Sequence, residues 1–63
     1  MIALLIKPES ADWRASWLHG SLLWIQGKER EAQRTGADTR VFVARSLDEV
    51  DSLVAEMNER SER

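Results

Sequence analysis

An unbroken apolar run near the start of the chain, Ile2 to Ile6, is the feature that most limits the fold. The run is closed by Lys7 and Pro8, and proline interrupts a helix and disfavours helical backbone in the residue before it. Five residues are too few for a stable helix, and the β-branched residues at both ends of the run favour extended backbone. We therefore predict a buried strand at residues 2–6.

A second strand and a helix are predicted in the last third of the chain. Apolar residues lie on both faces of an extended segment at residues 40–44, which predicts a strand there. Ser46 and Glu49 have the spacing of a capping box, which predicts a helix at residues 46–60 that frays from about residue 61. One face of this helix is apolar and is assigned to the core: Leu47, Val50, Leu53, Val54 and Met57.

The tryptophans dominate the segment between these elements. At about 100° per residue, Trp13, Trp17 and Trp24 fall within one stripe, which favours a single helix at residues 11–35. Ser10 is the expected N-cap of this helix, and Gly20 the expected position of a bend. A glycine at residue 36 stands where such a helix would end.

An alternative interpretation ends the helix at Gly20 and makes Ser21–Gln26 a short strand. We favour the long helix, because a helical piece at residues 28–35 would have only Ala32 to bury. The predicted fold is then one small α/β domain of residues 1–63, in β-α-β-α order, with a two-stranded parallel sheet. The alternative gives the order βαββα and an α+β fold.

Composition excludes several kinds of site. The chain of 63 residues has no cysteine and one histidine, His19, so it lacks a disulfide framework, a thiolate zinc site and a centre built on several imidazoles. No third group is expected to orient His19 as a catalytic triad requires. The carboxylates at residues 48–51 are explained by the start of a helix. We therefore expect no enzymatic activity, no metal and no cofactor.

The uncharged segment Ala15–Gly27 is the longest in the chain. As a helix it would span ~20 Å, against roughly 30 Å of membrane hydrocarbon, so we expect no membrane span. The first residues have no basic region of the kind that opens a signal peptide. These features favour a cytoplasmic protein, and the small size suits a bacterial or phage origin.

Three tryptophans in so short a chain indicate a binding surface. One helix cannot bury both the tryptophan stripe and the neighbouring leucine and isoleucine stripe against two strands. We therefore predict a non-enzymatic protein–protein interaction module, such as a small inhibitor or accessory factor that docks on a larger protein. The same stripe, or the open strand edges, also predicts a homodimer. The candidate contact residues are Trp13, Trp17, Gly20, Trp24 and Lys28.

Nucleic-acid binding is the alternative function. The net charge of −2 gives no overall attraction to phosphate, but residues 26–45 carry five basic and three acidic side chains. In this interpretation a tryptophan stacks on a base and arginines contact the phosphates. The candidate contacts are Arg30, Arg34, Arg40 and Arg45.

Overall fold

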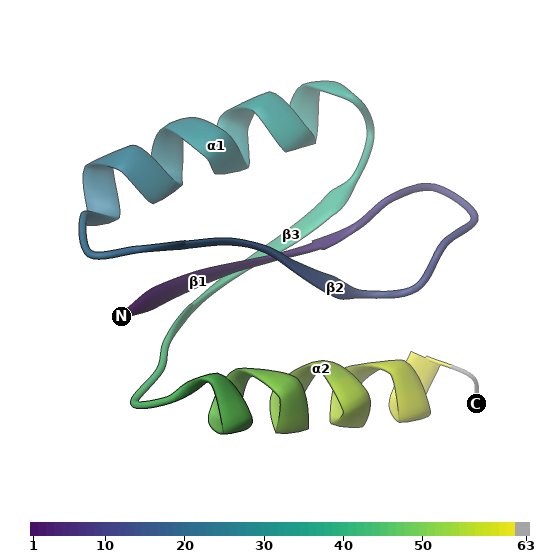
Figure 1. Ribbon diagram of the computed structural model, residues 1–63. Helices are drawn as coiled ribbons and strands as arrows, with labels where there is room; N and C mark the ends of the chain where they lie inside the picture. The colour runs from purple at the N-terminus through teal and green to yellow at the C-terminus, as the bar shows by residue number, and fades with distance from the viewer. Residues whose placement is uncertain (62–63) are drawn as a thin grey trace.

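The computed structural model describes residues 1–61, which form three strands and two helices in the order β1-β2-α1-β3-α2. The strands form an antiparallel sheet in the order β2-β1-β3, with β1 in the centre. Figure 1 shows α1 over one face of this sheet and α2 over the other, so the molecule has three layers. The elements are β1 (Ile2–Lys7), β2 (Arg14–His19), α1 (Leu22–Arg34), β3 (Asp38–Val43) and α2 (Leu47–Ser61).

The predicted β-α-β-α fold with a two-stranded parallel sheet is wrong, and so is the alternative that makes Ser21–Gln26 a strand. Residues 14–19, assigned above to a long helix, form a strand, and residues 22–26 begin α1. The reason lies in β1, where Ala3, Leu4 and Leu5 are fully buried. A strand buried in this way needs a neighbour on each side, and the chain supplies the second one by turning back directly through residues 8–13. The result is an α+β arrangement.

Three of the predicted elements are confirmed. The strand predicted at residues 2–6 is β1, and the strand predicted at 40–44 overlaps β3, which begins two residues earlier. The helix predicted at 46–60 is α2, and the Oγ of Ser46 accepts a hydrogen bond from the N–H of Glu49 at 3.2 Å, as the cap requires. Fraying is predicted from about residue 61: Ser61 is the last residue of α2, and residues 62–63 lie outside the described residues.

Local signals set both ends of α1. Ser21 is its N-cap, and its Oγ accepts a hydrogen bond from the N–H of Trp24 at 3.4 Å. At the other end, Gly36 takes a φ of 86° and the N–H of Ala37 reaches back to the C=O of Ala32 at 3.4 Å. This backbone pattern closes a helix with a left-handed residue, which glycine adopts without strain. The predicted helix end at Gly36 is therefore confirmed.

The predicted helix start at Ser10 is wrong. Ser10 lies in a turn, in which the N–H of Ala11 donates to the C=O of Pro8 at 3.3 Å. Its φ is 62°, and a positive φ at the third residue is typical of a type II turn. The turn directs the chain back along β1 instead of into a helix.

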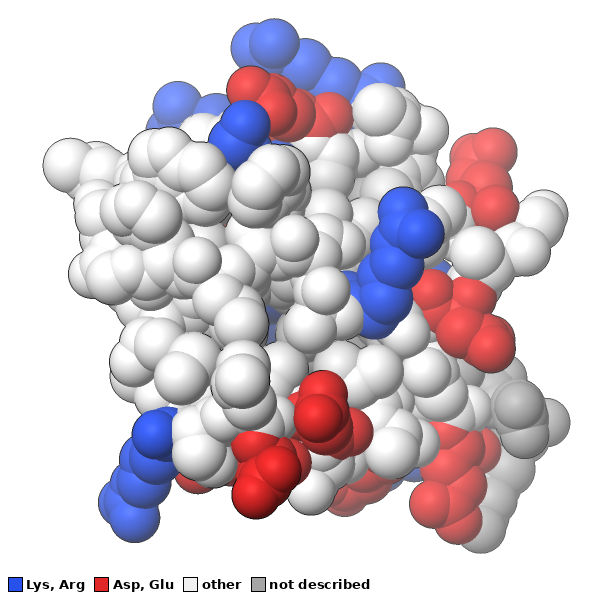
Figure 2. All heavy atoms as spheres, in the orientation of Figure 1, with Lys and Arg blue, Asp and Glu red and all other residues white. Residues whose placement is uncertain are grey.

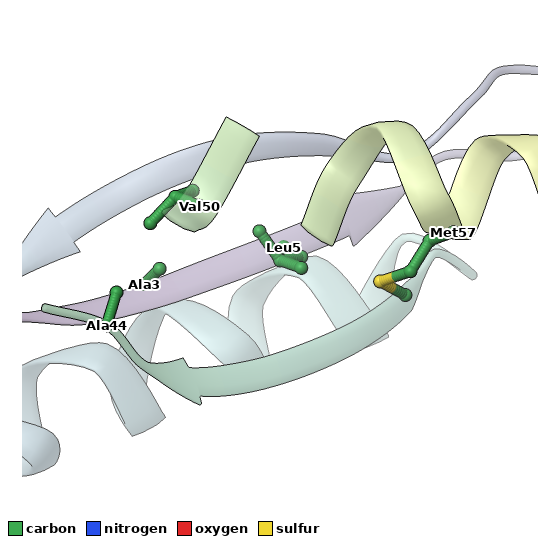
Figure 3. Close-up of a cluster of buried hydrophobic side chains, with 5 residues drawn as sticks. All are labelled: Ala3, Leu5, Ala44, Val50 and Met57. Atoms are coloured by element: carbon green, nitrogen blue, oxygen red, sulfur yellow. The ribbon is translucent and has the colours of Figure 1, made fainter. Parts of the chain in front are cut away.

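Two separate cores lie on the two faces of the sheet. Figure 3 shows the larger one beneath α2, formed by Ala3, Leu5, Ala44, Val50 and Met57. The core beneath α1 is smaller. It contains Leu4 of β1 and Ile25, the one buried residue of α1. We call these two sides the α2 face and the α1 face.

A bulge in β2 decides which face each tryptophan joins. Leu4 is opposite Trp17 and Leu5 is opposite Ala15, so Ser16 is an extra residue between the two pairs. Because side chains alternate along a strand, Trp17 shares the α1 face with Leu4. Trp13 reaches the opposite side and packs against the core of the α2 face.

Candidate interaction surface

Four side chains form one contact cluster where β2 meets α1. The rings of Trp17 and Trp24 meet edge to face, with centroids 5.3 Å apart and an interplanar angle of 79°. The ring of His19 stacks on Trp24 at 4.4 Å and 16°. The Nζ of Lys28 lies 4.8 Å from the ring centroid of Trp17 and 5.3 Å from that of Trp24. We call these four residues the aromatic platform.

The local sequence brings the platform together through a short turn. Trp17 and His19 are two residues apart on β2, so their side chains lie on the same face of the sheet. The N–H of Ser21 donates to Nδ1 of His19 at 2.9 Å, which fixes the imidazole ring just before α1 begins. Trp24 and Lys28 are one helical turn apart and therefore share a side of α1. The first turns of α1 are thus folded back onto β2.

The platform is exposed although its members hold one another in place. Trp17 is 42% exposed and Trp24 is 38% exposed. Next to Trp24 in the first turn of α1, Leu22 and Leu23 are exposed as well, Leu23 at 82%. Figure 2 shows a broad surface without Lys, Arg, Asp or Glu around the beginning of α1. Exposed apolar residues in an uninterrupted run usually serve a binding function in a stable protein.

The platform offers large aromatic area at a small entropic cost. Edge-to-face ring contacts and the nearby ammonium group of Lys28 both favour the observed arrangement. Glu31 lies 3.5 Å from this ammonium group and balances its charge. Docking of a partner here would therefore cost little side-chain entropy, because these side chains are already held in place.

The structure gathers three of the five predicted contact residues, Trp17, Trp24 and Lys28. Gly20 lies in the turn between β2 and α1, and a Cβ atom built there has no other atom within 4 Å. It therefore borders the platform on an open side, although it does not bend a helix as predicted. Trp13 does not join the platform, because the bulge places it on the α2 face.

Trp13 instead has a structural role. Its N–H donates to Oδ1 of Asn58 at 2.7 Å, and its C=O accepts from Nδ2 of the same side chain at 3.0 Å. Asn58 thus ties the start of β2 to the last turns of α2 across the α2 face.

Sequence reasoning missed His19, Leu22 and Leu23 as parts of the surface. The signal for His19 was its spacing of two residues from Trp17. This spacing places both side chains on one face only if residues 14–19 are known to form a strand. The signal for the leucines was their position after the N-cap Ser21, which starts α1 with two consecutive apolar residues.

The four candidate arginines for nucleic acid are not brought together. Arg30 and Arg34 are exposed on α1, whereas Arg40 of β3 is paired with Leu5 and so belongs to the α2 face. Arg45 follows β3 in the connection to α2. Figure 2 shows the basic side chains at the top of the view beside acidic ones, and the others on that face standing apart from one another.

Within the described residues, no group of three or more His, Cys, Asp or Glu side chains is placed to hold a metal ion. Neither helix there combines the length and the apolar content that a membrane crossing needs. Comparisons of the chain with protein-family models, with curated proteins and with solved structures found no match. The geometry of the aromatic platform is therefore the basis on which a function is assigned.

Proposed function

We propose that this chain is a non-enzymatic protein-interaction module that docks on a partner protein through the aromatic platform. The observation that carries the proposal is the pair Trp17 and Trp24, which is fixed by ring contacts and yet about two-fifths exposed. Tryptophan is enriched among the residues that dominate binding energy at protein interfaces. The small size of the chain suits an inhibitor or an accessory factor of a larger protein.

The distribution of charge supports a protein partner over nucleic acid. The uncharged segment Ala15–Gly27 contains both tryptophans of the platform. Among the four platform residues, Lys28 is the one lysine or arginine. Phosphate recognition needs several basic side chains along one surface. Of the four candidate arginines, Arg30 and Arg34 share α1, whereas Arg40 lies on β3 and Arg45 in the connection to α2. Nucleic-acid binding and the cytoplasmic location both stay predictions.

The proposal is tested by site-specific photo-crosslinking in cells that produce the chain. A photoreactive residue replaces Leu23, which is exposed at the platform, and in a matched control it replaces Ala55, which is exposed on α2. We expect discrete protein adducts from position 23 that fall sharply in Trp17→Ala and Trp24→Ala variants. A hot-spot residue contributes about 2 kcal/mol or more, which corresponds to a loss of affinity of roughly 30-fold.

Two outcomes would contradict the proposal. The first is equal adduct formation from positions 23 and 55, since the platform would then have no preference as a contact surface. The second is adduct formation that persists in correctly folded Trp17→Ala and Trp24→Ala chains. A salt titration with a fluorescent single-stranded oligonucleotide tests the alternative, because phosphate binding falls steeply with salt and a tryptophan-centred contact changes little.

A further inference from the structure

The outer edge of β2 borders the aromatic platform and is open. Within the described residues, β2 has a neighbouring strand on one side only, and every residue of it is exposed or half-exposed. Edge strands are usually protected by charges, by proline or by a bulge. β2 carries one charge, Arg14 at its beginning, and its bulge at Ser16 leaves the second half of the strand regular.

The hydrogen-bond pattern of the sheet shows which residue of β2 faces this open side. Met1 and Ala44 exchange two backbone hydrogen bonds, at 3.1 and 2.8 Å, so they form a hydrogen-bonded pair. Because such pairs alternate, odd-numbered residues of β1 turn their backbone groups to β3 and even-numbered ones to β2. Trp17 and His19 are paired with even-numbered residues and are bonded inward. Leu18, between them, turns its N–H and C=O outward.

We propose that a second copy of this chain occupies the open edge, with the two β2 strands antiparallel and Leu18 opposite Leu18 on a twofold axis. This inference rests on the proposed function and names a second copy, in place of a larger protein, as the partner at the same surface. In this register each Leu18 exchanges both outward backbone hydrogen bonds with its counterpart. The two sheets join into one continuous sheet, and the Leu18 side chains, 41% exposed in the single chain, cover each other on the α2 face.

The same register joins the two platforms. Trp17 of one copy lies opposite His19 of the other, and these positions form a non-hydrogen-bonded pair, in which side chains approach closely. Gly20 lies opposite Ser16 of the other copy, so the residue without a side chain meets the bulge. A Cβ at residue 20 would find no atom within 4 Å in the single chain, which leaves that space for the second copy.

Neither the charges nor the area that an interface needs opposes a second copy. The two Arg14 side chains lie eight positions apart along the paired strands, or ~26 Å at strand rise, which is well beyond the Debye length of about 8 Å at physiological salt. A stable interface buries about 1,200 Å² or more in total, or about 600 Å² for each copy. That is about one-eighth of the 4495 Å² surface of the chain. The exposed large apolar side chains of β2 and of the first turn of α1 are Trp17, Leu18, Leu22, Leu23 and Trp24.

Sedimentation of the full chain over a micromolar concentration series tests the association. We expect the mass to rise from 7.2 kDa to twice that value and to stop there, because a twofold contact closes on itself. Masses that continue to grow would overturn the proposal, since they indicate an open head-to-tail assembly. In parallel, hydrogen exchange of the Leu18 amide should slow at least tenfold with concentration. If a dimer forms but this amide exchanges at an unchanged rate, the contact lies elsewhere and the proposal is overturned as well.

Two substitutions of opposite charge at Leu18 test the register. Leu18→Lys and Leu18→Glu should each weaken self-association at least tenfold, because the twofold axis places like charges side by side. A mixture of the two variants should associate at least tenfold more strongly than either alone. Val43→Lys is the matched control: Val43 is 72% exposed on the other edge strand, and its variant should dimerise like the wild type. A mixture that associates no better than its components overturns the register.

The proposed function and the dimer fail in different ways. Far-UV circular dichroism establishes that each variant is folded. The exchange rate of the Leu18 amide is measured in the wild type, so this test does not depend on the folding of a variant. A wild-type chain that stays at 7.2 kDa while Trp-dependent adducts to other proteins form from position 23 refutes the dimer alone. A chain that stays at this mass and forms no such adducts refutes both.

Discussion

Replacing Asn58 with alanine should remove a large part of the stability of this fold. The side chain makes two hydrogen bonds to the backbone of Trp13, at 2.7 and 3.0 Å, in a half-buried position. Both backbone groups lose their partner in Asn58→Ala, and an unsatisfied buried group costs roughly 1–3 kcal/mol. Because the site is only partly buried, we expect the unfolding free energy to fall by about 2–4 kcal/mol in total. A chain of 63 residues has roughly 3–9 kcal/mol to lose.

The measurement is chemical denaturation followed by far-UV circular dichroism, with hydrogen exchange of the Trp13 amide as a local readout. Asn58→Asp is the matched control. Its carboxylate still accepts from the N–H of Trp13 but sets an acceptor oxygen against the C=O, so at least half of the loss is expected while the amide should stay protected. A loss below about 0.5 kcal/mol in Asn58→Ala, with an unchanged exchange rate, would refute the reasoning and show that this link does not hold β2 to α2.

Three substitutions and one deletion test the backbone. Gly27 is exposed within α1 and has open space at its Cβ position, so Gly27→Ala should raise the unfolding free energy by about 0.5–1 kcal/mol. Gly36→Ala should lower the unfolding free energy by about 1 kcal/mol or more, because the φ of Gly36 is 86° and Glu9 Oε1 lies 3.1 Å from the new Cβ. Ser10→Asn should raise it by about 0.5 kcal/mol, since asparagine tolerates the observed φ of 62° better than serine. Denaturant unfolding measures all three. Deletion of Ser16 removes the bulge but keeps every residue pair on either side of it, so the chain should still fold, with cross-strand Overhauser effects between β1 and β2 unchanged.

The elements that could be predicted from the sequence are those with strong local signals. β1 is an apolar run ended by proline, and α2 begins at a capping box followed by one apolar face. The end of α1 at Gly36 depends on a glycine at a left-handed position. In each case a few neighbouring residues are enough to determine the structure.

β2 could not be predicted in this way. It is an edge strand that is exposed along most of its length, and its alternation of polar and apolar residues is short because it breaks at Leu18. The bulge at Ser16 adds a residue that no periodicity would reveal. The spacings of Trp13, Trp17 and Trp24 match a helical stripe by coincidence. Trp17 and Trp24 do meet, but across a turn between a strand and a helix, and the contact surface was identified from the wrong geometry.

The position of the platform follows from the burial of β1. A central strand with full burial needs a covering helix on each face and a strand on each side, and this chain meets all four requirements with four short elements. Among residues 1–61, no further element covers the outer strands. The first half of β3 carries Asp38 and Arg40, which discourage pairing with another chain, whereas β2 beyond its bulge carries only Trp17, Leu18 and His19. The arrangement that buries the core therefore leaves its open, uncharged edge next to the two exposed tryptophans, where an additional strand would complete the sheet.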